Sequence, residues 1–168
     1  APPPDPPHAP RRPVLLDGGE ALKGAMDLFA YRLHGKEKRL ALSPDSERPL
    51  LETDPALLRR VLVNMLKNAL EAAEPDETVM AGVRTEGADE DGRGAAVFWV
   101  RNRAVMPEAT RRRVFHRSFS TKGPGRGVGT YGMRLLGEGY LGGSIGFRTR
   151  EGEGTVFELR LPLVVPMI

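Results

Sequence analysis

The sequence predicts an α/β sandwich in which a mixed, mainly antiparallel sheet is covered on one face by three helices. Two predicted hairpins support the sheet. In each, two strand patterns flank an acidic segment that contains glycine, at residues 86–94 in the first and at residues 151–154 in the second. Apolar patterns of helical period at residues 19–35 and 55–73 predict two helices, and a segment at residues 130–139 that follows a glycine-rich loop and ends at glycine predicts a third. Hairpins combined with amphipathic helices are typical of a sheet with helices packed on it.

The composition is that of one ordinary domain, with 168 residues of which 40% are hydrophobic and 28% charged. Residues 1–13 contain seven prolines, so we predict a proline-rich linker or disordered tail there and a single domain over residues 14–168. The absence of cysteine excludes disulfides, thiolate zinc sites and thiol nucleophiles. No segment approaches the roughly 20 apolar residues that span a bilayer. We therefore expect a cytoplasmic fragment without membrane contact, whose parent protein could still carry an anchor elsewhere.

Positive charge is concentrated in residues 99–134, where nine Lys or Arg residues face a single acidic residue, Glu108. Such a segment predicts an anionic partner, although a solvated helix surface is an alternative for Arg111, Arg112 and Arg113. The arginines are not interleaved with stacking aromatic residues, so nucleic acid is the weaker reading and we expect no nucleic-acid partner, whereas phosphate and an acidic protein face stay open.

The strongest helix pattern runs over residues 55–73. Asp54 is a good N-cap, and Pro55 suits the first helical position, where its missing N–H costs nothing. The apolar stripe consists of Leu58, Leu62, Met65, Leu66, Ala69 and Leu70. Asn64, Asn68 and Glu71 follow one another at spacings of four and three, so two amides and a carboxylate share one face beside this stripe.

The remaining elements follow from strand patterns and turn signals. Apolar residues at helical spacing from residue 19 lead into the first of five predicted strands, at residues 39–43, 78–85, 95–101, 144–150 and 155–163. A short helix is expected at residues 107–115, and a glycine-rich loop at residues 123–129 opens directly into the helix at residues 130–139.

Two features carry candidate chemistry. Gly125, Gly127 and Gly129 immediately precede a helix, where backbone N–H groups and the helix N-terminus can bind phosphate, although a purely structural loop is an equally simple reading. The loop is not a Walker motif and does not open a Rossmann unit. The amide oxygen of Asn68 is a competent Mg²⁺ ligand, but asparagine on a helix is also an ordinary hydrogen-bonding residue.

Four motifs in order resemble those of sensor histidine kinase catalytic domains. Residues 62–72 (LVNMLKNALEA) resemble the N box, and residues 115–123 (FHRSFSTKG) resemble the F box. Residues 125–129 (GRGVG) resemble the second glycine box, and residues 152–162 (GEGTVFELRLP) resemble the closing strand. The resemblance implies the Bergerat ATP-binding fold (HATPase_c), shared with gyrase, HSP90 and MutL.

The resemblance also implies ATP and Mg²⁺ as cofactors and assigns roles by position. Asn68 would bind the metal, and the catalytic set would be Asn64, Lys67, Asn68 and Lys122. The nucleotide would be bound by Asn64, Asn68, Asn102, Met106, Lys122, Gly125, Gly127, Val128, Gly129, Thr130 and Thr155.

The implied reaction is transfer of the ATP γ-phosphoryl group to a histidine outside this fragment. His8, His34 and His116 all lack the family's phosphoacceptor setting. The implied partners are a dimerisation and phosphoacceptor domain, upstream in the parent chain or on another protein, and the receiver domain of a response regulator.

The first glycine box departs from the family pattern. The family has Asp-x-Gly-x-Gly-Ile/Met-Pro, whereas residues 101–107 read RNRAVMP. Arg101 stands at the position of the aspartate that accepts a hydrogen bond from the adenine amino group. Arginine cannot accept a hydrogen bond, so this contact is lost unless Asn102 substitutes with its amide oxygen. Arg103 and Val105 replace both glycines. Two alternatives therefore stay open, namely a domain that keeps the fold but acts as a scaffold or regulatory partner, and a serine kinase of the anti-sigma-factor type.

Overall fold

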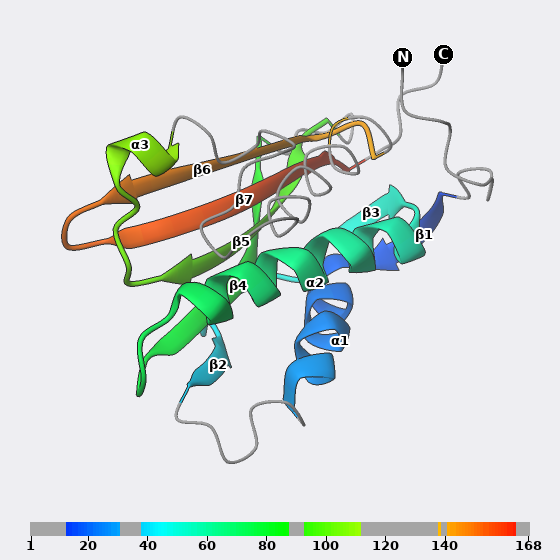
Figure 1. The fold of residues 1–168 in the computed structure, drawn as a ribbon. Helices are drawn as coiled ribbons and strands as arrows, with labels where there is room; N and C mark the ends of the chain where they lie inside the picture. The colour runs from blue at the N-terminus through cyan, green and yellow to red at the C-terminus, as the bar shows by residue number, and fades with distance from the viewer. Residues whose placement is uncertain (1–12, 31–37, 88–92, 112–137, 139–140, 164–168) are drawn as a thin grey trace, which may run out of the picture.

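The computed structural model describes residues 13–30, 38–87, 93–111, 138 and 141–163 (Figure 1). Its elements, in chain order, are β1 (Val14–Asp17), α1 (Gly18–Ala30), β2 (Arg39–Leu42), β3 (Leu50–Thr53), α2 (Pro55–Ala72), β4 (Thr78–Glu86), β5 (Ala95–Asn102), α3 (Glu108–Arg111), β6 (Ser144–Arg150) and β7 (Gly154–Pro162). The proline-rich tail expected at residues 1–13 lies, apart from its last residue, outside the described residues.

Five strands form the main sheet in the order β2-β4-β5-β7-β6. β2 and β4 are parallel, whereas the other three neighbouring pairs are antiparallel. Both hairpins expected from the sequence, β4–β5 and β6–β7, are present. The prediction of a mixed, mainly antiparallel sheet is therefore confirmed.

A second, two-stranded sheet joins β1 to β3 and was not expected from the sequence. Its antiparallel register runs from Val14 opposite Thr53 to Asp17 opposite Leu50. Leu51 and Thr53 are buried, whereas Leu15 remains exposed on the other face. This small sheet supplies Leu51 to the core and leads directly into α2.

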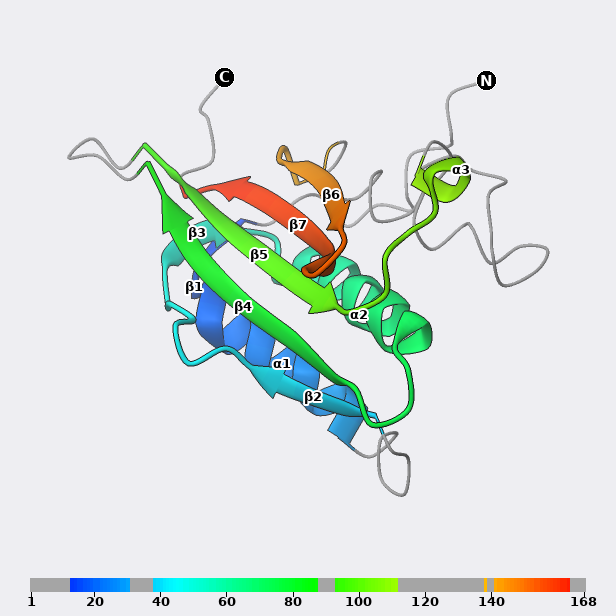
Figure 2. The same cartoon turned by 90° about the vertical axis from the view of Figure 1, so that its left-hand side faces the viewer.

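Helices α1 and α2 pack against each other and lie on the same face of the main sheet (Figure 2). The short α3 lies beyond the end of β5 and does not cover that face (Figure 1). The third covering helix expected at residues 130–139 falls almost entirely outside the described residues, as does the predicted end of the first helix at residues 31–35. No helix in the described part of the chain is both long enough and apolar enough to cross a membrane.

Helix α2 begins as the sequence predicts. The Asp54 side chain accepts hydrogen bonds from the backbone N–H groups of Ala56 at 3.0 Å and Leu57 at 3.1 Å, and Pro55 occupies the first turn. The buried face of the helix comprises Leu58, Val61, Leu62, Met65, Leu66, Ala69 and Leu70. The cap and the apolar stripe together fix how α2 lies on the sheet, and hence where its polar residues lie.

The inner face of the sheet completes the core. On β5, Phe98 and Val100 are buried in the core cluster, whereas Arg101 is exposed. Successive side chains on a strand point to opposite faces, so Phe98, Val100 and Asn102 face the helices and Trp99 and Arg101 face outward. The end of β5 thus presents Asn102, and not Arg101, to the helix layer.

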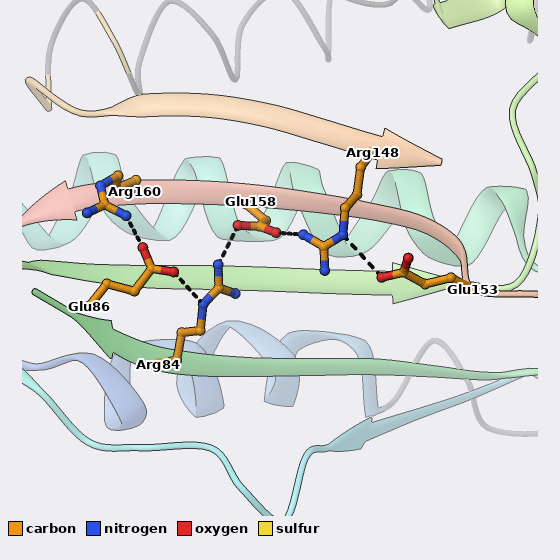
Figure 3. Close-up of polar contacts among 6 residues, drawn as sticks. All are labelled: Arg84, Glu86, Arg148, Glu153, Glu158 and Arg160. Carbon is orange, nitrogen blue, oxygen red and sulfur yellow. Dashed lines mark hydrogen bonds and ion pairs between the residues drawn. The ribbon is translucent and has the colours of Figure 1, made fainter. Parts of the chain in front are cut away.

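A chain of ion pairs crosses the outer face of the sheet (Figure 3). Arg84 bridges Glu86 at 2.9 Å and Glu158 at 2.7 Å, Arg160 pairs with Glu86, and Arg148 pairs with Glu158 and, at 3.1 Å, with Glu153. Hydrogen bonds from Arg160 and then from Arg84 lower the pKa of Glu86. The arginine and glutamate side chains of this network thus bind one another across the outer face of the sheet.

Candidate functional site

The polar residues of α2 lie beside its buried face. Asn64 and Asn68 are half-buried and one turn apart, whereas Lys67 and Glu71 are exposed. The three residues predicted to share one side of this helix, Asn64, Asn68 and Glu71, are therefore in place on a single regular helix. The amides lie at the margin of the core, while the charged groups extend toward solvent.

Glu77 brings the end of α2 and the end of β5 together. Its buried carboxylate accepts the backbone N–H of Glu74 at 3.1 Å and the backbone N–H of Arg103 at 2.8 Å. Glu74 follows the last turn of α2, and Arg103 follows Asn102, the last residue of β5. The turn of α2 that carries Asn68 and the inward-facing Asn102 therefore lie at the same end of the sheet.

The structure distinguishes Asn102 from Arg101, the two residues that the sequence offered at the position of the family's adenine-binding aspartate. Only 4% of Asn102 is exposed, and it pairs with Thr155 on β7, whereas Arg101 is exposed and pairs with Met80 on the outer face. By strand phase, the residue at the end of β5 that faces α2 is an amide. The family pattern, when aligned at Pro107, puts the aspartate at Arg101, which is one residue before the position that faces α2.

The loop after β5 is held by side-chain hydrogen bonds. The Met106 N–H donates to Thr149 Oγ1 at 2.8 Å, and Thr155 Oγ1 lies 2.7 Å from the carbonyl oxygen of Ala104 and 3.0 Å from Thr149 Oγ1. Because a carbonyl can only accept, Thr155 donates its single proton to Ala104, and the contact between the hydroxyls uses the proton of Thr149. The loop is therefore held on both sides of Val105.

Gly154 allows this close packing. A Cβ at Gly154 would lie 2.1 Å from the carbonyl oxygen of Asn102, and its φ of +89° also disfavours other residues. The start of β7 thus supports the end of β5 directly. A pocket of about 570 Å³ adjoins this point on the outer side; its lining residues are Thr78, Met80, Arg101, Asn102, Arg103, Gly152, Glu153 and Gly154.

The predicted site residues divide into two groups. The structure describes Asn64, Lys67, Asn68, Asn102, Met106 and Thr155 and places them on α2, at the end of β5 and on β7. The predicted residues of the phosphate loop and its surroundings, Lys122, Gly125, Gly127, Val128, Gly129 and Thr130, lie outside the described residues. Among the residues that the structure describes, no cluster of three or more His, Cys, Asp or Glu could hold a metal ion.

Sequence reasoning missed Glu77 and Thr149. The hairpin signal at residues 151–154 was not enough for Thr149, because a register centred on those four residues places Thr149 opposite Val156, whereas the turn in the structure is one residue shorter and pairs Thr149 with Thr155. Nothing in the local sequence distinguishes Glu77 from the other acidic residues near it, since its two partners are brought together only by the fold.

Two curated relatives are sensory proteins. The chain is 32% identical over 128 residues to the sensory/regulatory protein RpfC of Xanthomonas campestris, which is 72% of this chain and 17% of RpfC. It is 26% identical over 148 residues to the sensor histidine kinase ZraS of Escherichia coli, which is 88% of this chain and 30% of ZraS. The chain thus spans less than a third of the length of either relative.

Solved structures share the fold. The catalytic domain of histidine kinase ThkA superposes with a TM-score of 0.74 at 24% identity, covering 91% of this chain and 97% of that chain. ThkA in complex with the response regulator TrrA gives 0.70 at 21% identity, covering 91% and 42%. Full-length ShkA in complex with AMPPNP gives 0.72 at 25% identity, covering 96% and 33%.

The family model of the histidine kinase-, DNA gyrase B- and HSP90-like ATPases matches residues 53–165, which begin just before α2 and end just after β7. This range contains both asparagines of α2, Asn102 and Thr155. The match covers most of the chain, and the solved histidine kinase domains share its fold. The protein therefore belongs to the histidine kinase-, DNA gyrase B- and HSP90-like ATPase family.

Proposed function

We propose that this domain binds ATP with Mg²⁺ and transfers the γ-phosphoryl group to a histidine on a dimerisation and phosphoacceptor domain, which lies elsewhere in the parent protein or on another chain. Family membership supports ATP as the ligand. The observation that carries the proposal is the presence of Asn102 and the Asn68 turn of α2 at the same end of the sheet, on the face that the helices cover.

The proposed nucleotide lies with its base near Asn102 and its phosphates along α2. The amide oxygen of Asn102 accepts a hydrogen bond from the adenine amino group, and Met106 lines the base. Met106 is half-buried and packs against the core, which suits an apolar wall of the base pocket. The Thr155 hydroxyl has already donated its proton to Ala104, so it can only accept a hydrogen bond from the nucleotide or from water.

The phosphate end of the proposed site uses α2 and the glycine-rich segment. Asn68, which is half-buried, would supply its amide oxygen to Mg²⁺. This cation prefers oxygen ligands of that kind. Asn64 and the exposed Lys67 lie on the phosphate side. Lys122, Thr130 and the backbone around Gly125, Gly127, Val128 and Gly129 cover the triphosphate in this proposal. When bound, Mg²⁺ neutralises charge on the phosphate oxygens.

Catalysis in this proposal consists of positioning and charge neutralisation. Phosphoryl transfer involves a loose transition state with charge spread over the phosphate oxygens, so a general base from this domain is unnecessary. The incoming histidine nitrogen supplies its own lone pair. The phosphoryl group would then pass to an aspartate of a response regulator; among the fold neighbours, ThkA has been solved with such a partner. We place this reaction in the cytoplasm, where ATP is the available donor.

Calorimetric titration with a non-hydrolysable ATP analogue, with and without Mg²⁺, tests the proposal. We expect magnesium-dependent binding that Asn68→Ala weakens by at least about 10-fold, as for loss of a metal ligand. Arg59→Ala, an exposed residue on the first turns of the same helix, is the matched control and should bind as the wild type does. The absence of any binding at millimolar nucleotide would refute the proposal.

One observation favours the scaffold alternative. Residues 103 and 105, which the resemblance expects to be glycine, are exposed Arg103 and Val105 in a loop that is held by side chains. A domain that has given up nucleotide could tolerate such changes. The same titration decides between the two functions, because a scaffold needs no magnesium-dependent affinity for ATP.

A further inference from the structure

We propose that Thr149 and Glu77 are positioning residues for the base end of the nucleotide site. They hold the loop at residues 103–106, which follows Asn102 and ends at Met106. They act on the nucleotide only through that loop. The inference rests on the proposed function for the nucleotide, whereas the hydrogen bonds themselves belong to the described structure.

The loop needs such support because little else fixes it. Residues 103–107 form no helix or strand, and both Arg103 and Val105 are exposed. Apolar packing acts mainly at Met106, whose side chain lies against the core. An irregular segment with exposed side chains samples many backbone conformations unless its polar groups are bound.

Thr149 and Thr155 form a directed chain of hydrogen bonds with the loop. The Met106 N–H can only donate and the Ala104 carbonyl can only accept, so the direction is fixed at both ends. The proton order runs from Met106 N–H to Thr149 Oγ1, from the Thr149 hydroxyl to Thr155 Oγ1, and from the Thr155 hydroxyl to Ala104 O. Each hydroxyl donates once and accepts once. Thr149 is the member of this chain that lies on β6, one strand further from Asn102.

Glu77 holds the other end of the loop. One of its carboxylate oxygens accepts from the Arg103 N–H and the other accepts from the Glu74 N–H, and only 3% of Glu77 is exposed. The Glu77 backbone forms two further hydrogen bonds, since its N–H donates to Glu74 O and its carbonyl accepts from Arg39 N–H. The tether therefore starts from a rigid point, between the end of α2 and the start of β4.

A tethered loop binds ligand more tightly than a loose one because the cost of ordering it is already met by folding. Removal of one tether leaves Asn102 on its strand but frees the segment that follows it. We expect nucleotide affinity to fall while the fold persists. A net hydrogen bond of ordinary strength corresponds to a factor of about 5 to 10 in affinity.

Thr149→Val tests the tether, because valine keeps the shape and removes the hydroxyl. We expect the Met106 amide to exchange with deuterium at least about 10-fold faster, and the ATP analogue to bind about 5- to 10-fold more weakly. Thr149→Ser should restore both values, since it restores the hydroxyl. Thr53→Val is the matched control, because Thr53 is also a buried threonine but lies on β3, away from the loop. Glu77→Ala removes the acceptor of the Arg103 N–H, so the Arg103 amide should also exchange with deuterium faster.

Each outcome is decisive. Unchanged exchange of the Met106 amide in Thr149→Val would overturn the tether, and faster exchange with unchanged affinity would overturn the positioning role. Equal weakening by Thr53→Val would show a general loss of stability instead. If the wild-type domain binds no nucleotide, the proposed function fails and the positioning role fails with it, while the exchange rates still decide whether the tether exists.

Discussion

Asn102 and Thr155 lie opposite each other on the antiparallel strands β5 and β7, and only 4% of each is exposed. Both point to the face that α1 and α2 cover, at the end of the sheet where Glu77 joins α2 to the loop after β5. A buried amide beside a buried hydroxyl, at the edge of an otherwise apolar core, is an arrangement suited to binding a polar ligand.

The base preference of the domain should depend on Asn102. An amide can present either its oxygen to the adenine amino group or its NH₂ to the guanine carbonyl, whereas an ionised carboxylate can only accept. We therefore expect Asn102→Asp to raise the preference for an ATP over a GTP analogue by about 10-fold, mostly through weaker GTP binding. Competitive titration of the two analogues measures the ratio.

The control for this prediction is Asn102→Leu, which keeps a similar volume and removes both polar groups. It should weaken both nucleotides and leave little preference. An ATP-to-GTP ratio that is the same in the wild type and in the Asn102→Asp variant would contradict the assignment of Asn102 to the base.

Two glycines of the β6–β7 turn should differ in their sensitivity to substitution. Gly152 and Gly154 have similar φ values of +85° and +89°, but a Cβ at Gly152 meets nothing within 4 Å, whereas one at Gly154 meets the Asn102 carbonyl. We expect Gly152→Ala to cost about 1–3 kcal/mol through backbone strain alone. Gly154→Ala should cost roughly 2 kcal/mol more, because the loop after β5 must move. Urea unfolding measures both values.

The pair also reports on the site. Nucleotide affinity should fall in Gly154→Ala and stay near the wild-type value in Gly152→Ala. If the two variants lose the same stability and the same affinity, the close approach of Gly154 to Asn102 is not what positions the loop.

The outer-face ion pairs should make stability depend on pH through Glu86. Arg160 and Arg84 lower its pKa in the folded protein below the ordinary value of 4.5. This contribution is therefore fully present above about pH 4.5 and disappears as the pH falls through the lowered folded pKa. We expect Glu86→Gln to lower Tm by about 1–3 °C at pH 7, because the pairs are partly exposed.

Thermal unfolding of Glu86→Gln and the wild type between pH 7 and about pH 2.5 checks this prediction. The two melting curves should converge at the acid end, and 1 M salt should reduce the difference at pH 7. A difference that grows as the pH falls would have the wrong sign and would assign the stabilisation to another group.

The N-cap of α2 should contribute to stability in the ordinary way. Asp54→Ala removes the acceptor for the N–H groups of Ala56 and Leu57, so we expect a loss of about 1 kcal/mol in the free energy of unfolding. Asp45→Ala, an exposed aspartate in the turn after β2, is the control and should change stability by less than about 0.5 kcal/mol. Equal losses in the two variants would mean that the cap is not the cause.

Local signals in the sequence were enough for several elements. The boundaries of α2 agree with prediction because a capping aspartate, a proline and an apolar stripe all act within one segment. The predicted strand at residues 144–150 agrees with β6, because a tight turn sets the register of a hairpin. By contrast, β1 and β3 were missed. Each has four residues, and their pairing joins segments that are separated by a whole helix and a strand.

The sequence by itself determined the family motifs, the helix that carries Asn64 and Asn68, and the mainly antiparallel sheet, because these depend on residue types at short spacing. Only the tertiary structure decided that Asn102, and not Arg101, faces the helices. A shift of one residue along a strand moves a side chain to the opposite face, and that phase is set by pairing with β4 and β7. The roles of Glu77 and Thr149 were decided in the same way, because the loop that they hold lies far from both in the chain and meets them only once the sheet and α2 are packed.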